Sequence, residues 1–176
     1  MTLSRTSSIL DVSRTDHASG RLSFGPLFER VLATGGGTAP LVARLALGLI
    51  LFPHGAQHAL GWFGGYGFSG TLGWMTGTLG FPAALAAVGI VSELLAPLAL
   101  IAGIGGRIAG GLLFFHMAFA ASTHLKNGFF MNWFGAMPTG EEGFEYHLLA
   151  MALAAVVVIA GSGALSLDRK LTRGRV

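Results

Sequence analysis

The chain contains no cysteine among its 176 residues. It therefore forms no disulfide, no dithiol redox pair, no thiolate-bound iron–sulfur cluster and no c-type haem attachment, so a Cys-ligated cofactor is excluded. A redox role for this chain would have to depend on a histidine-bound metal, a diffusible quinone-like carrier or the cofactor of a partner protein.

Charge is also scarce. Charged residues make up 11% of the chain and hydrophobic residues 52%, whereas soluble domains carry about 25% charged residues. The few charges cluster near the ends and in one loop, which is typical of an integral membrane protein in a lipid bilayer. The basic residues flank apolar segments and form no stripe with interleaved aromatics, so the pattern argues against a nucleic-acid partner.

Four apolar segments approach or exceed the length of about 20 residues that a spanning helix needs. They run from Pro40 to about Leu60, from Phe81 to about Gly103, from Arg107 to about Leu125 and from Phe144 to about Leu165. We predict an all-α fold, a four-transmembrane-helix bundle over residues 39–170. Residues 1–38 lack the apolar core of a signal peptide and are predicted to be a mostly disordered polar tail, with a short amphipathic piece from Leu22 to Leu32. Residues 171–176 form a basic tail.

The distribution of lysine and arginine predicts the orientation. Loop 61–80 has no charged residue, and loop 126–143 contains one lysine, Lys126, and two glutamates. The other side of the predicted bundle collects the basic residues Arg30, Arg44, Arg107, Arg169, Lys170, Arg173 and Arg175. Both termini are therefore expected in the cytoplasm, with the two long loops facing outward from the inner (plasma) membrane.

The two predicted outward loops are rich in aromatic residues. These are Trp62, Phe63, Tyr66, Phe68 and Trp74 in the first loop and Phe129, Phe130, Trp133 and Phe134 in the second. An interfacial aromatic belt is the favoured interpretation. The alternative is a lid of short interfacial helices over a pocket, and we expect such helices in both loops. The 28 glycines allow close helix packing and tight turns.

One internal repeat is visible. RLALGLILF (Arg44 to Phe52) and RIAGGLLFF (Arg107 to Phe115) share Arg, Ala, Gly, Leu and Phe at equivalent positions. Both segments open a predicted span. The repeat fits a bundle of two parallel helical hairpins, an arrangement that some transporters also show.

Ionisable residues lie inside the predicted spans, where they indicate a functional site. Glu93 falls roughly 18 Å into the second span at 1.5 Å per residue, and His116 lies near the middle of the third. His54 is slightly outward of the centre of the first span, and His58 lies one turn further out. The outer ends of the last two spans carry His124, Glu145 and His147.

Proline lies beside two of these groups. Pro97 cannot donate to the carbonyl of Glu93, and Pro53 frees the carbonyl of Leu49 just before His54. Two such interruptions favour an internal polar cavity as much as they favour a structural Glu–His or Glu–Arg pair. His54 and His58 share a helix face and could bind a metal with further ligands from His124, Glu145, His147 or Glu93. Interhelical hydrogen bonding is the simpler alternative.

Six sequence motifs together resemble the DoxX family of small four-helix membrane proteins, over about residues 40–170. They are HGAQHALGWFGG after an Arg-led first span, SELLAPLAL in the second, an arginine opening the third, NGFFMNWFG, GFEYHLL and a terminal ALSLDR. The resemblance implies an inner-membrane protein associated with redox chemistry. Related members serve as subunits of thiosulfate:quinone oxidoreductase, and others partner antioxidant enzymes.

The resemblance also implies which positions follow the family pattern. They are Arg44, His54, Gly55, Glu93, Arg107, Glu145 and Asp168. The family pattern leads us to expect lysine where His58 stands, so the resemblance assigns no role to this histidine. Asp168 follows the fourth span, where a helix cap or a partner of Arg169 is expected.

The leading hypothesis is a redox-associated membrane subunit with a site for a quinone-like ring in the outer half of the bundle. His54 and Glu93 are the predicted catalytic residues, exchanging protons with the ring. The predicted ligand-binding residues are His58, His116, His124, Arg44, Glu145 and His147. Electrons would come from a substrate or a partner redox subunit, and a histidine-bound metal is the lesser cofactor alternative. The competing functions are a non-enzymatic scaffold that docks a soluble redox enzyme and a small-molecule transporter. Because a bundle of four helices is thin, a homodimer is also consistent with the sequence.

Overall fold

The structure is a computed structural model that describes residues 25–138 and 141–172. All regular elements in these residues are helical, and no strand occurs among them, as the sequence predicts. Most of the predicted disordered tail, residues 1–24, lies outside the described residues, and so do residues 173–176 of the basic tail. The amphipathic piece predicted from Leu22 to Leu32 corresponds to a helix at Pro26–Leu32.

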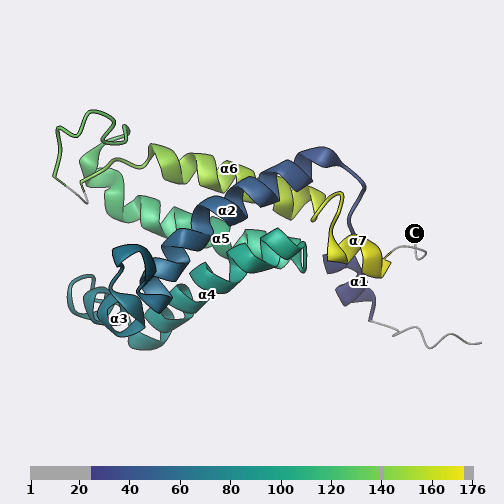
Figure 1. Ribbon diagram of the computed structural model, residues 1–176, viewed down its shortest axis with the longest axis horizontal. Helices are drawn as coiled ribbons and strands as arrows, with labels where there is room; N and C mark the ends of the chain where they lie inside the picture. Colours follow the sequence, from purple (N-terminus) through teal and green to yellow (C-terminus); the bar gives the residue numbers. More distant parts are fainter. Residues whose placement is uncertain (1–24, 139–140, 173–176) are drawn as a thin grey trace, which may run out of the picture.

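The chain forms seven α-helices and two single 3₁₀ turns in its described part (Figure 1). In chain order they are α1 (Pro26–Leu32), α2 (Thr38–Leu60), η1 (Trp62–Gly64), α3 (Gly67–Gly77), α4 (Ala83–Ala102), α5 (Gly106–His124), η2 (Leu125–Asn127), α6 (Glu145–Ala160) and α7 (Leu167–Thr172).

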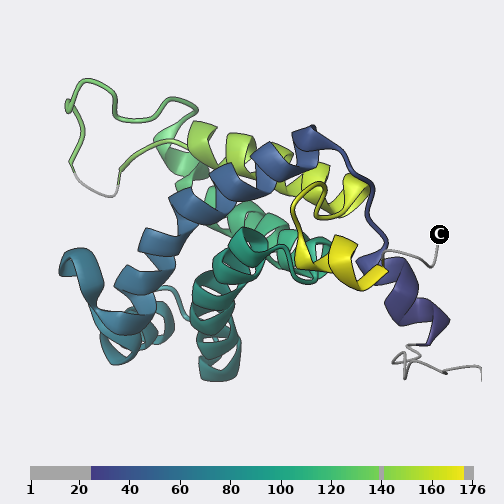
Figure 2. The ribbon, with the colours of Figure 1, turned by 45° about the vertical axis from the view of Figure 1, so that its right-hand side comes forward.

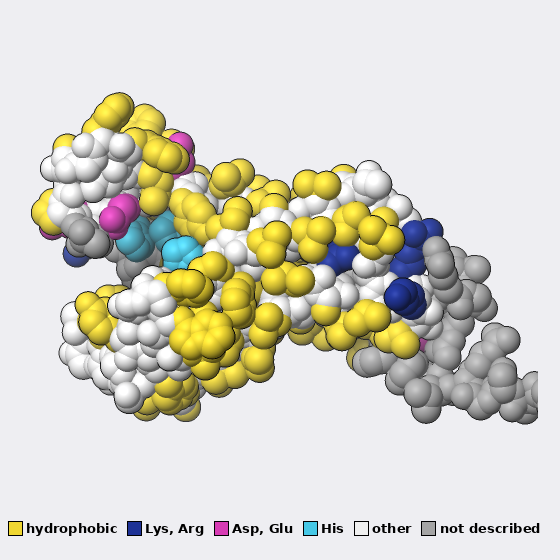
Figure 3. Space-filling view, in the orientation of Figure 1, with side chains coloured by type: hydrophobic (Ala, Val, Ile, Leu, Met, Phe, Trp, Pro, Cys, Tyr) yellow, Lys and Arg dark blue, Asp and Glu magenta, His cyan; other side chains and the backbone are white. Residues whose placement is uncertain are grey.

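Three helices are long and apolar enough to cross a membrane: α2, α4 and α5 together with η2. α6 is apolar but has 16 residues, a length of roughly 24 Å at 1.5 Å per residue. It ends earlier than the predicted Leu165, because Gly161 and Gly163 adopt positive φ angles of 78° and 70° and turn the chain toward α7. The outer faces of these helices expose apolar side chains, which form the largely hydrophobic surface in the middle of Figure 3.

α2, α4, α5 and α6 pack around one shared hydrophobic core. Its fully buried members are small and medium aliphatic residues: Ala43, Leu47 and Leu51 of α2, Ala96 and Leu100 of α4, Ala109, Leu113 and Met117 of α5, and Ala150, Ala154 and Val157 of α6. The molecule has two distinct ends (Figures 1 and 2). We call the end with α3 and residues 128–138 and 141–143 the loop end, and the end with α1 and α7 the arginine end.

Arg44 closes the arginine end of the α2–α4 pair. Its side chain is 1% exposed, and all of its N–H groups donate to backbone carbonyls. The acceptors are Ser162 at 2.8 Å, Leu100 at 2.6 Å, Ile101 at 2.8 Å, Ala164 at 3.3 Å and Leu165 at 3.0 Å. The guanidinium therefore bonds the last carbonyls of α4, where the helical hydrogen-bond pattern ends.

Arg107 does the same for the α5–α6 pair. It donates to the carbonyls of Val158 and Ile159 at the end of α6, and to Ala33 after α1. The two arginines of the sequence repeat thus occupy equivalent positions, each near the start of one helix and bonded to the end of its antiparallel partner. The repeat has a structural meaning: it marks two helical hairpins.

Asp168 joins these hairpins at the arginine end. Its carboxylate accepts hydrogen bonds from the backbone N–H of Gly105 at 2.8 Å and of Gly106 at 3.1 Å, and from the Ser162 hydroxyl at 2.6 Å. Asp168 is therefore a helix cap, as expected, but it caps the start of α5, a helix distant in sequence.

The two long loops differ from each other. The first contains α3, the short helix predicted there. The prediction of a similar helix in the second loop is wrong for its described residues, which follow η2 without a further helix until α6. Gly128 and Gly135 adopt φ angles of 85° and 63° there, and Gly143 donates back to the Phe130 carbonyl at 3.1 Å. These turns fold the segment onto itself instead of extending a helix.

Candidate functional site

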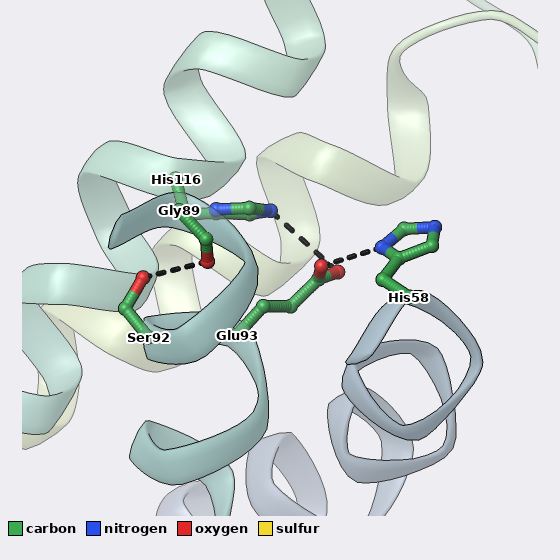
Figure 4. A network of polar contacts seen from close by, with 5 residues as sticks. All are labelled: His58, Gly89, Ser92, Glu93 and His116. Atoms are coloured by element: carbon green, nitrogen blue, oxygen red, sulfur yellow. Dashed lines mark hydrogen bonds and ion pairs between the residues drawn. The ribbon is translucent and has the colours of Figure 1, made fainter. Parts of the chain in front are cut away.

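Three helices bring Glu93, His58 and His116 together near the loop end (Figure 4). Glu93 of α4 is 4% exposed. Its Oε2 lies 2.6 Å from Nδ1 of His58 on α2, and its Oε1 lies 3.5 Å from Nε2 of His116 on α5. We call these three residues the Glu93 triad. A buried carboxylate in an apolar helix requires such partners, because an unpaired charge there is costly.

Gly55 allows α2 and α4 to approach each other at the triad. A Cβ atom on Gly55 would overlap the backbone carbonyl of Glu93. That carbonyl has no helical donor four residues later, because Pro97 lacks an N–H. Pro53 and Pro97 both lie inside helices that continue past them. The glycine thus places the His58 side chain, less than one turn further along α2, within reach of Glu93.

A cavity of about 260 Å³ lies beside His116 of the triad, between α4 and α5. Its lining comes from α3, α4, α5 and the segment before α4, and consists of Met75, Phe81, Leu85, Val88, Gly89, Ser92, Leu112, Phe115, His116 and Phe119. We call it the α4–α5 pocket. Ser92 donates its hydroxyl to the Gly89 carbonyl at 2.9 Å. The other polar side chain of the lining is His116, whose Nε2 faces Glu93.

The α4–α5 pocket opens on the outer, apolar face of the bundle. Leu85, Val88 and Phe115 belong to its lining and are exposed on that face. Phe81 and Phe119 stack edge to face across it, with ring centroids 4.7 Å apart. A ligand in this pocket would therefore reach His116 from the surface that faces lipid.

His54 does not contact Glu93. Its side chain is exposed, and its ring lies 6.3 Å from that of Tyr146 on α6. His124 and His147 lie close to this pair, with their own ring centroids 4.8 Å apart. The structure thus divides the predicted histidines into two neighbouring groups, one around Glu93 and one around Tyr146.

Two other predicted site residues hold the backbone in place. The Glu145 carboxylate accepts hydrogen bonds from the Met131 N–H at 3.3 Å and from the Trp133 indole at 3.1 Å, which ties the second loop to α6. Arg44 lies at the arginine end, away from the triad, with its donors already used. Neither residue has a free group directed at the α4–α5 pocket.

Sequence reasoning did not single out Tyr146 as a site residue. Its hydroxyl is buried and has no hydrogen-bond partner within the described residues. The available signal was its place in GFEYHLL, since a tyrosine hydroxyl in an apolar helix also needs a polar partner. Histidine side chains are visible in a notch between the α3 lobe and the second loop (Figure 3).

The described residues contain no group of three or more His, Cys, Asp or Glu side chains arranged to hold a metal ion. His54 and His58, the pair considered as metal ligands, contact different partners, Tyr146 and Glu93.

Comparison with known proteins assigns the family. The DoxX family model matches residues 39–133, a range that includes α2, α3, α4 and α5 and all three members of the Glu93 triad. No curated protein and no solved structure matches the chain. The match covers more than half of the chain and agrees with the three helices long and apolar enough to cross a bilayer. The chain is therefore a multi-pass integral membrane protein that belongs to the DoxX family.

Proposed function

We propose that this protein is a redox-associated membrane subunit that binds a quinone-like ring in the α4–α5 pocket. One observation carries the proposal: His116 lines the pocket and also contacts the buried carboxylate of Glu93. An apolar pocket with one imidazole in its wall suits a flat, apolar ring with a carbonyl oxygen. Its opening toward lipid suits a ligand dissolved in the bilayer.

The triad can supply the proton part of quinone chemistry. Reduction of a quinone to a quinol takes up two electrons and two protons, one proton for each ring oxygen. In our proposal His116 donates one proton to the nearer ring oxygen, and the Glu93–His58 pair returns a proton to His116. The other ring oxygen takes the second proton from water at the membrane surface. The electrons come from a partner redox subunit, since the chain has no cysteine to hold a cluster. His54, the other histidine predicted for this role, lies beside Tyr146 and not against Glu93.

The topology proposed for this function keeps α6 as the fourth span, with both termini in the cytoplasm and the loop end facing outward from the plasma membrane. The positions of Arg107, Arg169 and Lys170 at the arginine end support this orientation. The participation of α6 in the core shared by α2, α4 and α5 supports its place in the membrane.

The second candidate function is a scaffold that docks a soluble redox enzyme. It is favoured by the second loop, where Phe130, Trp133 and Phe134 project as exposed aromatic side chains, Phe134 being 97% exposed. Such a surface fits either an interfacial belt or a protein partner. The scaffold function does not require the Glu93 triad.

Titration with decylubiquinone tests the pocket. The protein is reconstituted in lipid nanodiscs, and quenching of its three tryptophans is followed as the quinone is added. We expect the quenching of the wild-type protein to saturate. The affinity for decylubiquinone should fall at least tenfold in Gly89→Leu, which fills the pocket, and in His116→Phe. The matched control is Gly111→Leu on α5, where a Cβ meets nothing within 4 Å.

The outcomes separate the two functions. Saturable binding that Gly89→Leu weakens and Gly111→Leu leaves unchanged supports the quinone site. Quenching that never saturates, or that is equal in all variants, overturns it. Stable capture of a redox enzyme by a protein whose quinone site fails this test would support the scaffold.

A further inference from the structure

A second polar cluster lies on the side of the triad away from the α4–α5 pocket. It consists of His54 on α2, Tyr146 and His147 on α6, and His124 on α5, and we call it the Tyr146 cluster. Successive ring centroids are 6.3 Å apart for His54 and Tyr146, 5.8 Å for Tyr146 and His147, and 4.8 Å for His147 and His124. The rings thus form an uninterrupted series across three helices.

Two buried polar atoms of this cluster have no hydrogen-bond partner within the described residues: the Tyr146 hydroxyl and Nδ1 of His147. His147 is only 9% exposed. Buried polar groups in proteins are almost always hydrogen-bonded, to protein or to ordered water. The Tyr146 hydroxyl and the His147 ring therefore each need a polar partner, which a water molecule can supply.

The cluster adjoins the triad along α2. His54 lies one helical turn before His58, on the same face of the helix. Gly55, between them, packs against the Glu93 backbone. The cluster therefore lies beside the carboxylate that the proposed function uses.

The opposite end of the series reaches the surface of the loop end. His124 donates its Nδ1–H to the Glu142 carbonyl at 2.7 Å, in the second loop. Asn127 donates to the same carbonyl at 3.1 Å. His124 is partly exposed, and Lys126 beside it is exposed. The series therefore runs from a buried carboxylate to a solvated loop.

From these four observations we propose that Tyr146, His147 and His124, with water between them, form a proton path that connects the Glu93 triad to the loop end. A proton enters at His124, passes to Nδ1 of His147 and the Tyr146 hydroxyl, and reaches Glu93 through the intervening water. Each group accepts a proton on one side and releases one on the other, so no electron donor is needed. The proposal rests on the proposed function for its purpose, since the path would resupply the protons that His116 gives to a quinone. The path itself can be measured without quinone.

The test follows hydrogen–deuterium exchange at the triad. Protein with ¹⁵N-labelled histidine in nanodiscs is transferred to D₂O, and the exchange rate of the His116 ring N–H is measured by NMR. Tyr146→Phe removes one hydroxyl and no ring, so the packing is kept. Both variants are made in a His58→Phe background, because the half-exposed His58 gives Glu93 a second route to the surface. Compared with His58→Phe alone, we expect Tyr146→Phe to slow exchange at His116 at least tenfold, and His147→Phe to do the same. Decylubiquinone affinity should stay within twofold of that of His58→Phe.

The matched control is Tyr66→Phe, the same change at the other tyrosine of the chain, which is exposed at the loop end. If the His116 ring N–H exchanges in Tyr146→Phe at the same rate as in His58→Phe alone, the proposed path is overturned, whether or not the protein binds quinone. Slowed exchange in a protein that shows no quinone binding supports the path and overturns the proposed function. Slowing by Tyr66→Phe as well would overturn the path, because it would show a general effect of the loop end.

Discussion

His58 Nδ1 and Glu93 Oε2 lie 2.6 Å apart, and this hydrogen bond joins α2 to α4 at the one acidic residue inside the helices long enough to span a membrane. The pair is asymmetric. The Glu93 side chain is 5% exposed, whereas that of His58 is 42% exposed. The carboxylate is held inside, and its partner reaches the surface of the loop end. Charge-assisted bonds of this length are among the stronger ones in proteins, so the pair both holds two helices together and gives Glu93 a partner for proton exchange.

Glu93→Gln should leave the fold intact and strongly slow proton-coupled quinone turnover. Glutamine has nearly the same shape and can still bond to His58, but it cannot take up and release a proton. Positioned acid–base groups contribute typically 10²–10⁴-fold to rate, so we expect quinone-dependent activity to fall at least about 10²-fold. The measurement is quinol formation in membranes that contain the partner donor. Wild-type turnover in this variant would remove Glu93 from the mechanism.

His58→Lys should keep the pairing with Glu93, while His58→Ala should break it. The family pattern leads us to expect lysine at this position, and an ammonium group can bond the same carboxylate oxygen. Truncation to alanine instead leaves a buried carboxylate with the weaker partner His116, at 3.5 Å. Loss of one partner of a buried charge costs about 3–5 kcal/mol, and partial exposure of His58 places our estimate at the lower end. Chemical unfolding in detergent compares the two variants, and equal loss in both would contradict the exchangeability of the two side chains.

Gly55→Ala should separate α2 from α4 at the triad. The added methyl group overlaps the Glu93 carbonyl, and backbone on both sides must move. Overpacking of this kind costs about 1–3 kcal/mol, and the His58–Glu93 distance should lengthen. Thermal unfolding gives the first effect, and a weakened ¹⁵N signature of the His58 hydrogen bond gives the second. Gly111→Ala is the control, since its Cβ meets nothing within 4 Å. A destabilised Gly111→Ala would show a general intolerance of alanine at helical glycines.

The sequence could predict Glu93 as a site residue because a carboxylate in an apolar helix is anomalous in any fold. It could not choose between His54 and His58, because they lie one turn apart on the same face and the choice depends on how far α2 is shifted along its axis against α4. That axial position follows from the close approach at Gly55, a contact between distant residues. The result is that His58 contacts Glu93 and His54 lies near Tyr146.

The same limit applies at the arginine end. The sequence analysis predicts Arg44 to be a ligand-binding residue. Its actual acceptors include Ser162, Ala164 and Leu165, carbonyls of a segment predicted to be helical. Those carbonyls become available only because α6 ends at Ala160 and the chain turns at Gly161. A residue's role thus depended on a helix boundary, which sequence patterns define poorly.

Arg44→Lys should destabilise the protein more than Arg107→Lys, although the two arginines are equivalent in the repeat. Arg44 is 1% exposed and donates to five carbonyls, whereas a lysine ammonium has three donors. At least two buried carbonyls of Arg44→Lys lose their partner, at about 1–3 kcal/mol each, so we expect a loss of about 3 kcal/mol. Arg107 is less buried and donates to three carbonyls, which a lysine can match in number and which water can also reach. Unfolding of both variants in the same detergent measures the difference. Equal losses would mean that the burial of Arg44 adds nothing to its role, and that the two hairpins are closed by their arginines in the same way.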